Sequence, residues 1–230
     1  MTEAADTVFL DGEIHTLTDP DETHEAVAVR DGEIVRLGST YDVEFLAGTD
    51  TDTIDLDGRV LLPGFIDGHT HLTNVGKYLV HADLSAAEEL DEAVSLLRER
   101  EQSTADPDES EWVLGYGYDE STWPEDRYLD REDLDAVSEE RPVAAFREDL
   151  HVASVNSVVL DRYEDEMVEA DVHYGEDGEP TGVLVEDAVN VISEVVAPDA
   201  EETGRLVAAA QARANELGVT GVHDMVRGSA

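Results

Sequence analysis

The sequence predicts an α/β protein with a parallel sheet, preceded by a small β-rich segment. Two observations lead to this fold class. Residues 7–62 hold short apolar runs separated by Asp-Gly pairs, whereas strand-like and helix-like patterns alternate after Gly64. Strands that alternate with helices indicate a parallel sheet with right-handed crossovers. The length of 230 residues and the hydrophobic content of 41% provide for one sizeable domain, or for a small and a medium one.

The N-terminal segment is expected to form hairpins. Short strands are predicted at 7–10, 25–30 and 53–56, and an Asp-Gly pair follows each of them. Such a pair supplies the positive φ that tight hairpin turns need. The segment Asp11–Ile14 recurs as Asp31–Ile34, which we interpret as two similar hairpins and not as a repeat family. These features predict a small β-sandwich, or half of one.

The remainder of the chain shows helical and strand patterns in alternation. A helix is predicted to begin at the capping box Ser85–Glu88 and to extend to Arg100. Its apolar positions share one helical face, namely Leu90, Ala93, Val94 and Leu97. Further strands are predicted at 112–118, 142–147, 171–174, 181–185 and 219–224, helices at 130–137, 152–160, 187–196 and 199–217, and loops at 102–110 and 119–128. Gly218 is expected as the C′ residue of the last helix.

The composition is extremely acidic. Asp and Glu number 57 against 14 Lys and Arg, which gives a formal net charge of -43, and Lys77 is the only lysine. Regular apolar patterns run through the whole chain, so we expect folded structure and not acidic disorder. Acidity spread over every predicted surface is typical of a soluble halophilic protein, because high salt shortens the reach of self-repulsion. The charge argues against nucleic acid and anionic membranes as partners.

The absence of cysteine limits the chemistry. It excludes disulfides, thiolate metal sites and a cysteine nucleophile, so that any metal must be held by His and carboxylates. Residues 1–6 lack the basic and apolar regions of a signal peptide, and no apolar run has the length of a membrane span. We therefore expect a cytoplasmic protein.

Two histidines one residue apart are the strongest local signal. His69 and His71 follow a nearly continuous apolar run, which is typical of a strand buried on both faces. Side chains at i and i+2 of a strand point to the same face, so both imidazoles can approach one metal ion. Asp67 has the same parity and lies one step deeper. The pattern predicts a metal site at the end of this strand.

Several segments together carry a family resemblance. The run Leu62–Leu72 resembles the first barrel strand of the amidohydrolase superfamily. Further segments resemble its YtcJ-like branch, the amidohydrolase 3 group related to N-substituted formamide deformylase: Gly115–Asp119, Leu134–Val137, Arg141–Val143, His151–Ser157, Gly178–Glu186 and Leu217–Asp224. The resemblance covers essentially the whole chain, in order.

The resemblance implies a metal-dependent hydrolase on a (β/α)8 TIM-type barrel, with a β-sandwich made from both chain ends. Residues 1–62 would form the N-terminal sandwich portion. Residues 63–230 would form the first part of the barrel, with an insertion around 102–186. Family members are typically more than twice this long. We therefore expect a partial barrel in a truncated chain that lacks the later histidine ligands and the catalytic Asp of the last strand.

The implied reaction is hydrolysis of non-peptide, amide-like carbon–nitrogen bonds by metal-activated water, with one or two divalent ions, chiefly Zn²⁺. One alternative is an inactive or split fragment that needs a partner chain. Another is a non-catalytic binding domain that keeps only the fold. The expected partners are a small-molecule substrate and either a second copy of the chain or a complementary C-terminal chain.

The resemblance implies that His69, His71 and Glu186 are metal ligands. The alternative for the histidines is a solvent-facing position at a strand end. Glu186 would take the place of the modified lysine found in many amidohydrolases, or it is a helix N-terminal glutamate favoured by the helix dipole. Asp67 either orients a ligand histidine or forms a turn beside Gly68.

His151 and Asp224 are the candidate catalytic residues. His151 either faces the pocket or is a structural histidine. His223 and Asp224 end a predicted barrel strand, where active-site groups gather, or they form a polar strand exit. Asn156 and Ser157 are interpreted as capping or packing residues. Four aromatic residues line either the pocket mouth or the core: Trp112, Tyr116, Tyr118 and Trp123.

Overall fold

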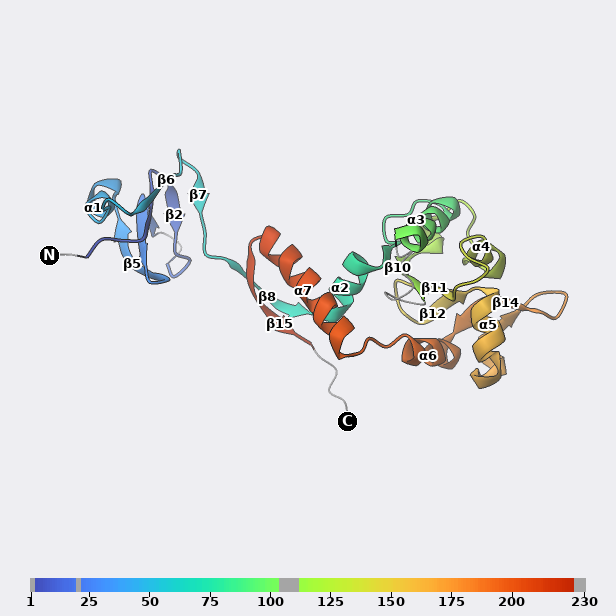
Figure 1. Ribbon diagram of the computed structural model, residues 1–230. Coiled ribbons are helices and arrows are strands. Elements are labelled where there is room, and N and C mark those ends of the chain that lie inside the picture. Colours follow the sequence, from blue (N-terminus) through green and yellow to red (C-terminus); the bar gives the residue numbers. More distant parts are fainter. Residues whose placement is uncertain (1–2, 20–21, 104–111, 226–230) are drawn as a thin grey trace. The chain divides into compact units, whose positions relative to one another are not determined.

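The chain divides into two compact units. The computed structural model describes residues 3–19, 22–103 and 112–225 (Figure 1). Unit 1 consists of Met1–Ile66 with Gly218–Gly221, and unit 2 of Asp67–Leu217 with Val222–Ala230. The division runs through two paired strands, β8 (Phe65–Thr70) and β15 (Val219–Asp224).

Unit 1 contains two small sheets. The four-stranded sheet has the order β5-β4-β1-β6, and the three-stranded sheet has the order β3-β2-β7. The elements are β1 (Thr7–Leu10), β2 (Glu13–His15), β3 (Thr23–His24), β4 (Ala26–Arg30), β5 (Glu33–Gly38), α1 (Thr40–Glu44), β6 (Asp52–Asp55) and β7 (Val60–Leu61). The strands predicted in this region are confirmed to within one residue.

The hairpin between β4 and β5 depends on its Asp-Gly pair. Asp31 and Gly32 both have positive φ, 53° and 76°, as a type I′ turn requires. A Cβ at Gly32 would meet no atom within 4 Å, so backbone conformation and not space favours glycine here. The pair Asp57-Gly58 also has positive φ at both residues but joins β6 to β7 of different sheets, and Asp11-Gly12 joins β1 to β2 of different sheets, so the hairpins expected at these two pairs were wrong.

The larger sheet of unit 1 has apolar residues on both faces. On one face, Val43 of α1 is fully buried in a cluster with Ala5, Val8, Leu10, Ala26 and Ala28. On the other face, Val27 of β4 packs with Ile14 of β2 and with Leu56, which joins the two sheets. This arrangement agrees with the predicted small sandwich.

Unit 2 is built around a six-stranded sheet with the order β13-β14-β12-β11-β10-β9. Its strands are β9 (Ala82–Asp83), β10 (Val113–Tyr118), β11 (Val143–Arg147), β12 (Val152–Val155), β13 (Val172–Tyr174) and β14 (Pro180–Val185). β9, β10 and β11 are parallel, whereas β12, β14 and β13 continue the sheet antiparallel. The prediction of a parallel sheet was therefore wrong for half of it. Only residues 148–151 join β11 to β12, which is too short for a parallel crossover.

The helix predicted at 152–160 was also wrong. The segment forms strand β12 and then α5 (Ser157–Tyr163), and Asn156 caps the helix by accepting a hydrogen bond from the Val159 amide. Every residue of β12 is buried. A strand buried on both faces gives a continuous apolar run, which cannot be told from a buried helix by its periodicity. The capping role expected for Asn156 is confirmed.

The remaining helices of unit 2 cover the sheet or pack beside it. They are α2 (Leu72–Val80), α3 (Leu90–Ser103), α4 (Arg131–Asp135), α6 (Glu186–Val195) and α7 (Ala200–Glu216), with 3₁₀ turns η1 (Glu120–Thr122), η2 (Glu164–Glu166) and η3 (Glu169–Asp171). The predicted capping box was wrong, because α3 begins at Leu90 and the Ser85 hydroxyl donates to Asp83. The predicted apolar face of α3 is confirmed as buried. Of the loop predicted at 102–110, residues 104–110 lie outside the described residues.

Two apolar clusters flank the six-stranded sheet. One contains buried residues of α3 and α4, including Leu97 and Leu134, with Tyr118 and Trp123. The other contains buried residues of α5 and α6, including Leu160 and Ile192, with Tyr116. Tyr116, Tyr118 and Trp123 are thus core residues, at most 3% exposed, while the half-buried Trp112 packs against the second cluster.

β8 and β15 form a two-stranded parallel pair. The Phe65 amide donates to the Gly218 carbonyl, and the Met225 amide donates to the Thr70 carbonyl, so both strands run in the same direction. Contrary to the prediction of a strand buried on both faces, Phe65 is 54% and Ile66 is 69% exposed. In the described part of the chain β15 alone pairs with β8, and the sheets there close no barrel.

Gly76 lets α2 lie directly against α7. A Cβ at this position would overlap the backbone of Leu206 in α7. We expect Gly76→Ala to lower the free energy of unfolding by about 1–3 kcal/mol, because the overlap involves backbone that cannot rotate away. Gly204→Ala is the matched control, since a Cβ there meets nothing within 4 Å in the same helix pair. It should raise stability by about 0.5–1 kcal/mol. Urea unfolding measures both, and equal stability of the two variants would contradict the close packing.

Candidate metal centre

His69 and His71 lie side by side at the end of β8. His69 belongs to the strand, and His71 is the residue before α2. Their ring centroids are 5.5 Å apart, with an angle of 77° between the ring planes. Both residues are exposed. The alternation of side chains along a strand thus brings the two imidazoles together, as the spacing predicted.

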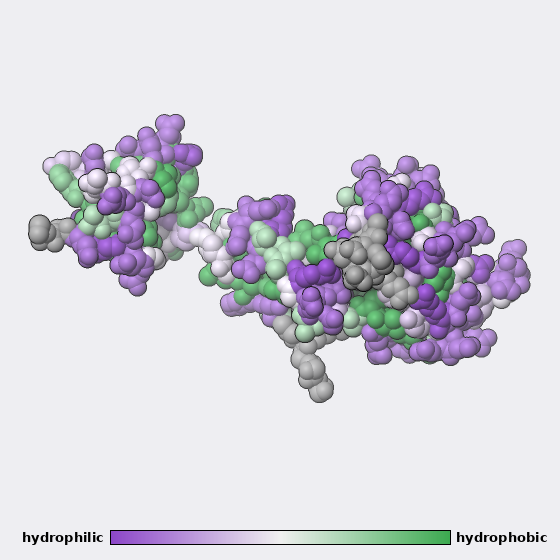
Figure 2. Space-filling model, viewed as in Figure 1, coloured by the Kyte–Doolittle hydropathy of each residue, from purple (hydrophilic) through white to green (hydrophobic). Residues whose placement is uncertain are grey.

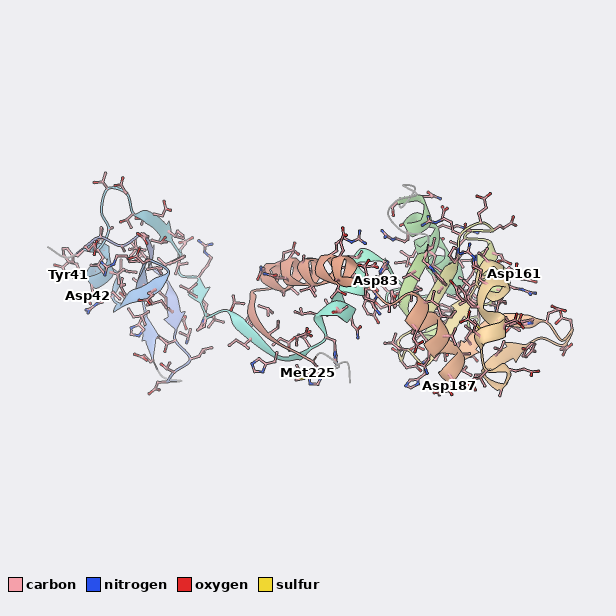
Figure 3. All side chains as sticks on the ribbon, turned by 60° about the horizontal axis from the view of Figure 1, so that its bottom comes forward. Tyr41, Asp42, Asp83, Asp161, Asp187 and Met225 are labelled. Atoms are coloured by element: carbon pink, nitrogen blue, oxygen red, sulfur yellow. The ribbon has the colours of Figure 1, made fainter. Side chains whose placement is uncertain are left out.

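The orientation of His71 is fixed from the end of β15. Nδ1 of His71 lies 2.9 Å from the carbonyl oxygen of Met225, a residue labelled in Figure 3. A carbonyl oxygen only accepts, so Nδ1 carries the proton and Nε2 keeps its lone pair. Metal-binding histidines commonly donate their other ring N–H to a backbone carbonyl in this way. Met225 could not be predicted as a partner of His71, because the contact uses a backbone atom.

Two carboxylates hold the backbone around the histidine pair. Asp224 Oδ1 accepts a hydrogen bond of 2.9 Å from the Leu72 amide at the start of α2. His71, the N-cap residue, makes no side-chain cap, so the carboxylate from β15 takes that role. Asp67 Oδ1 accepts from the His69 amide at 2.9 Å. Asp224 was predicted as a catalytic candidate, and its described contact is structural. The neighbouring His223 is exposed on β15.

His151 and Glu186 meet through the register of β12 and β14. Val152 pairs with Val185, and the Glu186 amide donates to the His151 carbonyl at 3.0 Å. The side chains also meet, with 3.3 Å between Nδ1 of His151 and Oε2 of Glu186. His151 therefore precedes a strand and does not begin a helix, while Glu186 is the first residue of α6, one residue before the predicted helix start.

One cavity of unit 2 brings three of the predicted site residues together. It has a volume of about 560 Å³ and includes His71, His151 and Glu186 among its lining residues. The other lining residues are Thr73, Asn74, Asp149, Leu150, Asn190, Ser193 and Met225. His69 and Asp224 are outside this lining set. Within residues 3–19, 22–103 and 112–225, no three His, Asp or Glu side chains are grouped closely enough to hold a metal ion.

The chain's only lysine belongs to a separate buried group between α2, α7 and β10. Lys77 Nζ lies 5.1 Å from the ring centroid of Tyr116, and burial lowers its pKa while Glu202 of α7 raises it. Burial also lowers the pKa of His81 to about 4, and His81 Nε2 lies 3.5 Å from Glu202 Oε1. These side chains are absent from the cavity lining and hold α2 against its neighbours.

Comparison with known proteins places the chain in a family. Residues 52–230 match the model of the Amidohydrolase family, Amidohydro_3. The chain belongs to this family. Within it, the chain is a YtcJ-like member of the amidohydrolase superfamily. The family resemblance predicted from the sequence is confirmed.

Individual relatives agree with this assignment. YtcJ of Bacillus subtilis (strain 168), which is named as an amidohydrolase, is 33% identical to this chain over 193 residues. The match covers 81% of this chain and 36% of YtcJ. N-substituted formamide deformylase of Arthrobacter pascens is 28% identical over 97% of this chain and 43% of its own. An uncharacterized metal-dependent hydrolase from Pyrococcus furiosus superposes with a TM-score of 0.71 at 24% identity, over 95% of this chain and 44% of its own.

The chain spans less than half the length of each of these relatives. In the described residues no helix combines the length and the apolar character that a membrane crossing requires.

Proposed function

We propose that this chain is a metal-dependent hydrolase that cleaves carbon–nitrogen bonds in amide-like substrates at a site formed on the first part of a barrel. In this proposal β8 and β15 are the first two strands of a partial (β/α)8 barrel, with α7 leading into the second. Family membership supports the reaction class, as does the name of the deformylase relative, which acts on N-substituted formamides. The observation that carries the proposal is the pair of adjacent imidazoles at the end of β8.

The histidine pair fits the first two ligands of a divalent ion such as Zn²⁺. Catalytic zinc sites take three protein ligands, and imidazole nitrogen is a preferred one. His71 would bind through Nε2, because its Nδ1 proton is engaged by Met225. When bound, a divalent ion supplies Lewis acidity at the carbonyl and an acidified water. In the described residues Glu186 is not grouped with the pair, and the pair is compatible with one divalent ion or with two.

The residues around the pair supply orientation. The Met225 carbonyl fixes the His71 ring, and the Asp224 carboxylate fixes the start of α2 directly after it. Preorganised ligands of this kind reduce the rearrangement that binding would otherwise need. The cavity lined by His71 gives a small amide access to that histidine.

Release of amine from N-substituted amides tests the proposal. The chelated protein should be inactive, and addition of Zn²⁺ should restore amine release, measured with an amine-reactive fluorophore. A matched control adds Mg²⁺, which prefers oxygen ligands. Bound zinc at the histidine pair without any amine release would contradict hydrolysis by this chain alone.

A second candidate is a chain that acts only with the remainder of a barrel supplied to it, either by a complementary chain or by a second copy. The exposure of Phe65 and Ile66 on β8 favours this candidate, because a barrel strand normally buries such residues. Under this candidate, amine release appears only after the complementary part is added.

A further inference from the structure

One wall of the cavity beside His71 comes from the six-stranded sheet and from helix α6. The turn between β11 and β12 contributes Asp149, Leu150 and His151, and helix α6 contributes Glu186, Asn190 and Ser193. The other lining residues come from α2 and its start and from Met225. The wall therefore combines two carboxylates, an imidazole, an amide and a hydroxyl on one side of a volume of about 560 Å³.

The charge of this lining is one-sided. It contains Asp149 and Glu186 but neither Arg nor Lys. Asp149 pairs with Arg147, whose Nη1 lies 2.7 Å from Asp149 Oδ2, and Arg147 also pairs with Asp119, Glu120 and Glu148. Glu186 instead meets the imidazole of His151, and both side chains are about two-thirds exposed, 67% and 69%. Both carboxylates make the cavity negative, and Glu186, 67% exposed against 40% for Asp149, is the more accessible of the two.

The backbone presents this wall in an unusual conformation. Leu150 and Glu186 both have positive φ, 62° and 46°, although neither is Gly, Asn or Asp. The left-handed region is unfavourable for such residues and is found mainly where surrounding structure imposes it, often at functional sites. Two residues of this kind line the same cavity.

We propose that this wall binds the nitrogen-bearing end of the substrate, with Glu186 accepting a hydrogen bond from an N–H or ammonium group. Asn190 and Ser193 add neutral hydrogen-bonding groups on the same helix. The substrates are therefore small amides with a neutral or cationic amine portion, and anionic substrates are disfavoured. This inference rests on the proposed function, since it gives the substrate class of the same site.

Binding of three small probes of equal carbon number tests the inference without any catalysis. Butylammonium, butanamide and butanoate are titrated separately into the protein at a salt concentration that keeps it folded, with backbone amide NMR shifts as the readout. We expect butylammonium to shift the signals of the Glu186 wall, and butanoate to leave them unchanged. Glu186→Gln should weaken butylammonium binding about tenfold, because a charge-assisted hydrogen bond is lost.

Glu194→Gln is the matched control, since it removes the same charge from the same helix at an exposed position outside the cavity lining. It should leave the affinity for butylammonium within about twofold of the original, which separates Glu186 from the general attraction of an acidic protein for cations. Equal losses in the two variants, or butanoate binding as tight as that of butylammonium, would overturn the inference. Zinc binding at His69 and His71 is measured independently, so failure here and failure of the proposed function give different results.

Discussion

Lowering the salt concentration is expected to unfold this protein. A net charge of -43 on 230 residues produces strong self-repulsion in the compact state, which is weaker in the expanded unfolded chain. The screening length is about 10 Å at 0.1 M salt and about 3 Å at 1 M, so high salt removes most of the repulsion between separated carboxylates. The melting temperature of the protein should therefore rise steeply with the KCl concentration. Circular dichroism over a KCl series measures it.

A charge-reduced variant provides the control. Glu33, Glu44, Asp161 and Glu194 are exposed carboxylates distributed over both units, and their amide replacements keep shape while removing four charges. The variant should be more stable than the original chain at low salt and equal to it at about 1 M KCl. Hydrophilic residues dominate the face shown in Figure 2. None of the four exchanged residues belongs to an apolar cluster, so the exchanges leave these clusters intact. A melting temperature that stays constant across the KCl series would refute the charge argument.

Turns and helix ends were largely predictable where one or two residues determine the local backbone conformation. Asp31-Gly32 defines a hairpin because its turn requires positive φ at both residues. Asp199 and Gly218 bracket α7 because capping satisfies amides and carbonyls at the helix ends. β12 was missed because its four buried residues look the same whether they form a strand or a buried helix. Because β12 was missed, the antiparallel half of the sheet was wrongly predicted to be parallel.

The sequence predicted that the rings of His69 and His71 lie together, but it did not predict the other contacts of the candidate site. The parity of His69 and His71 placed their rings together without any tertiary information. The family resemblance singled out His151 and Glu186, yet their meeting depends on the pairing of β12 with β14, which the sequence left undetermined. The hydrogen bond from His71 to Met225 could not be found at all, since any residue supplies a backbone carbonyl.

Replacing the histidine pair is expected to abolish zinc binding at this site. His69→Ala and His71→Ala should each weaken zinc binding about 100-fold or more, because each removes one imidazole from a site with few protein ligands. The control His173→Ala removes an exposed histidine of β13 that contacts Tyr128 and lies outside the cavity. It should leave the affinity unchanged. Isothermal titration with Zn²⁺ at high salt measures all three.

The spectroscopic signature of His71 makes this test independent of overall folding. Its Nδ1 proton is held by the Met225 carbonyl, so zinc should shift the Nε2 resonance strongly while the Nδ1–H signal persists. An effect on folding alone would instead change both nitrogens together. Equal zinc affinity in the three alanine variants would remove the histidine pair from the metal site, and with it the observation that carries the proposed hydrolysis. Because the two rings lie side by side in the described structure, we expect the pair to bind one ion jointly, so that the loss in the double variant differs from the sum of the two single losses.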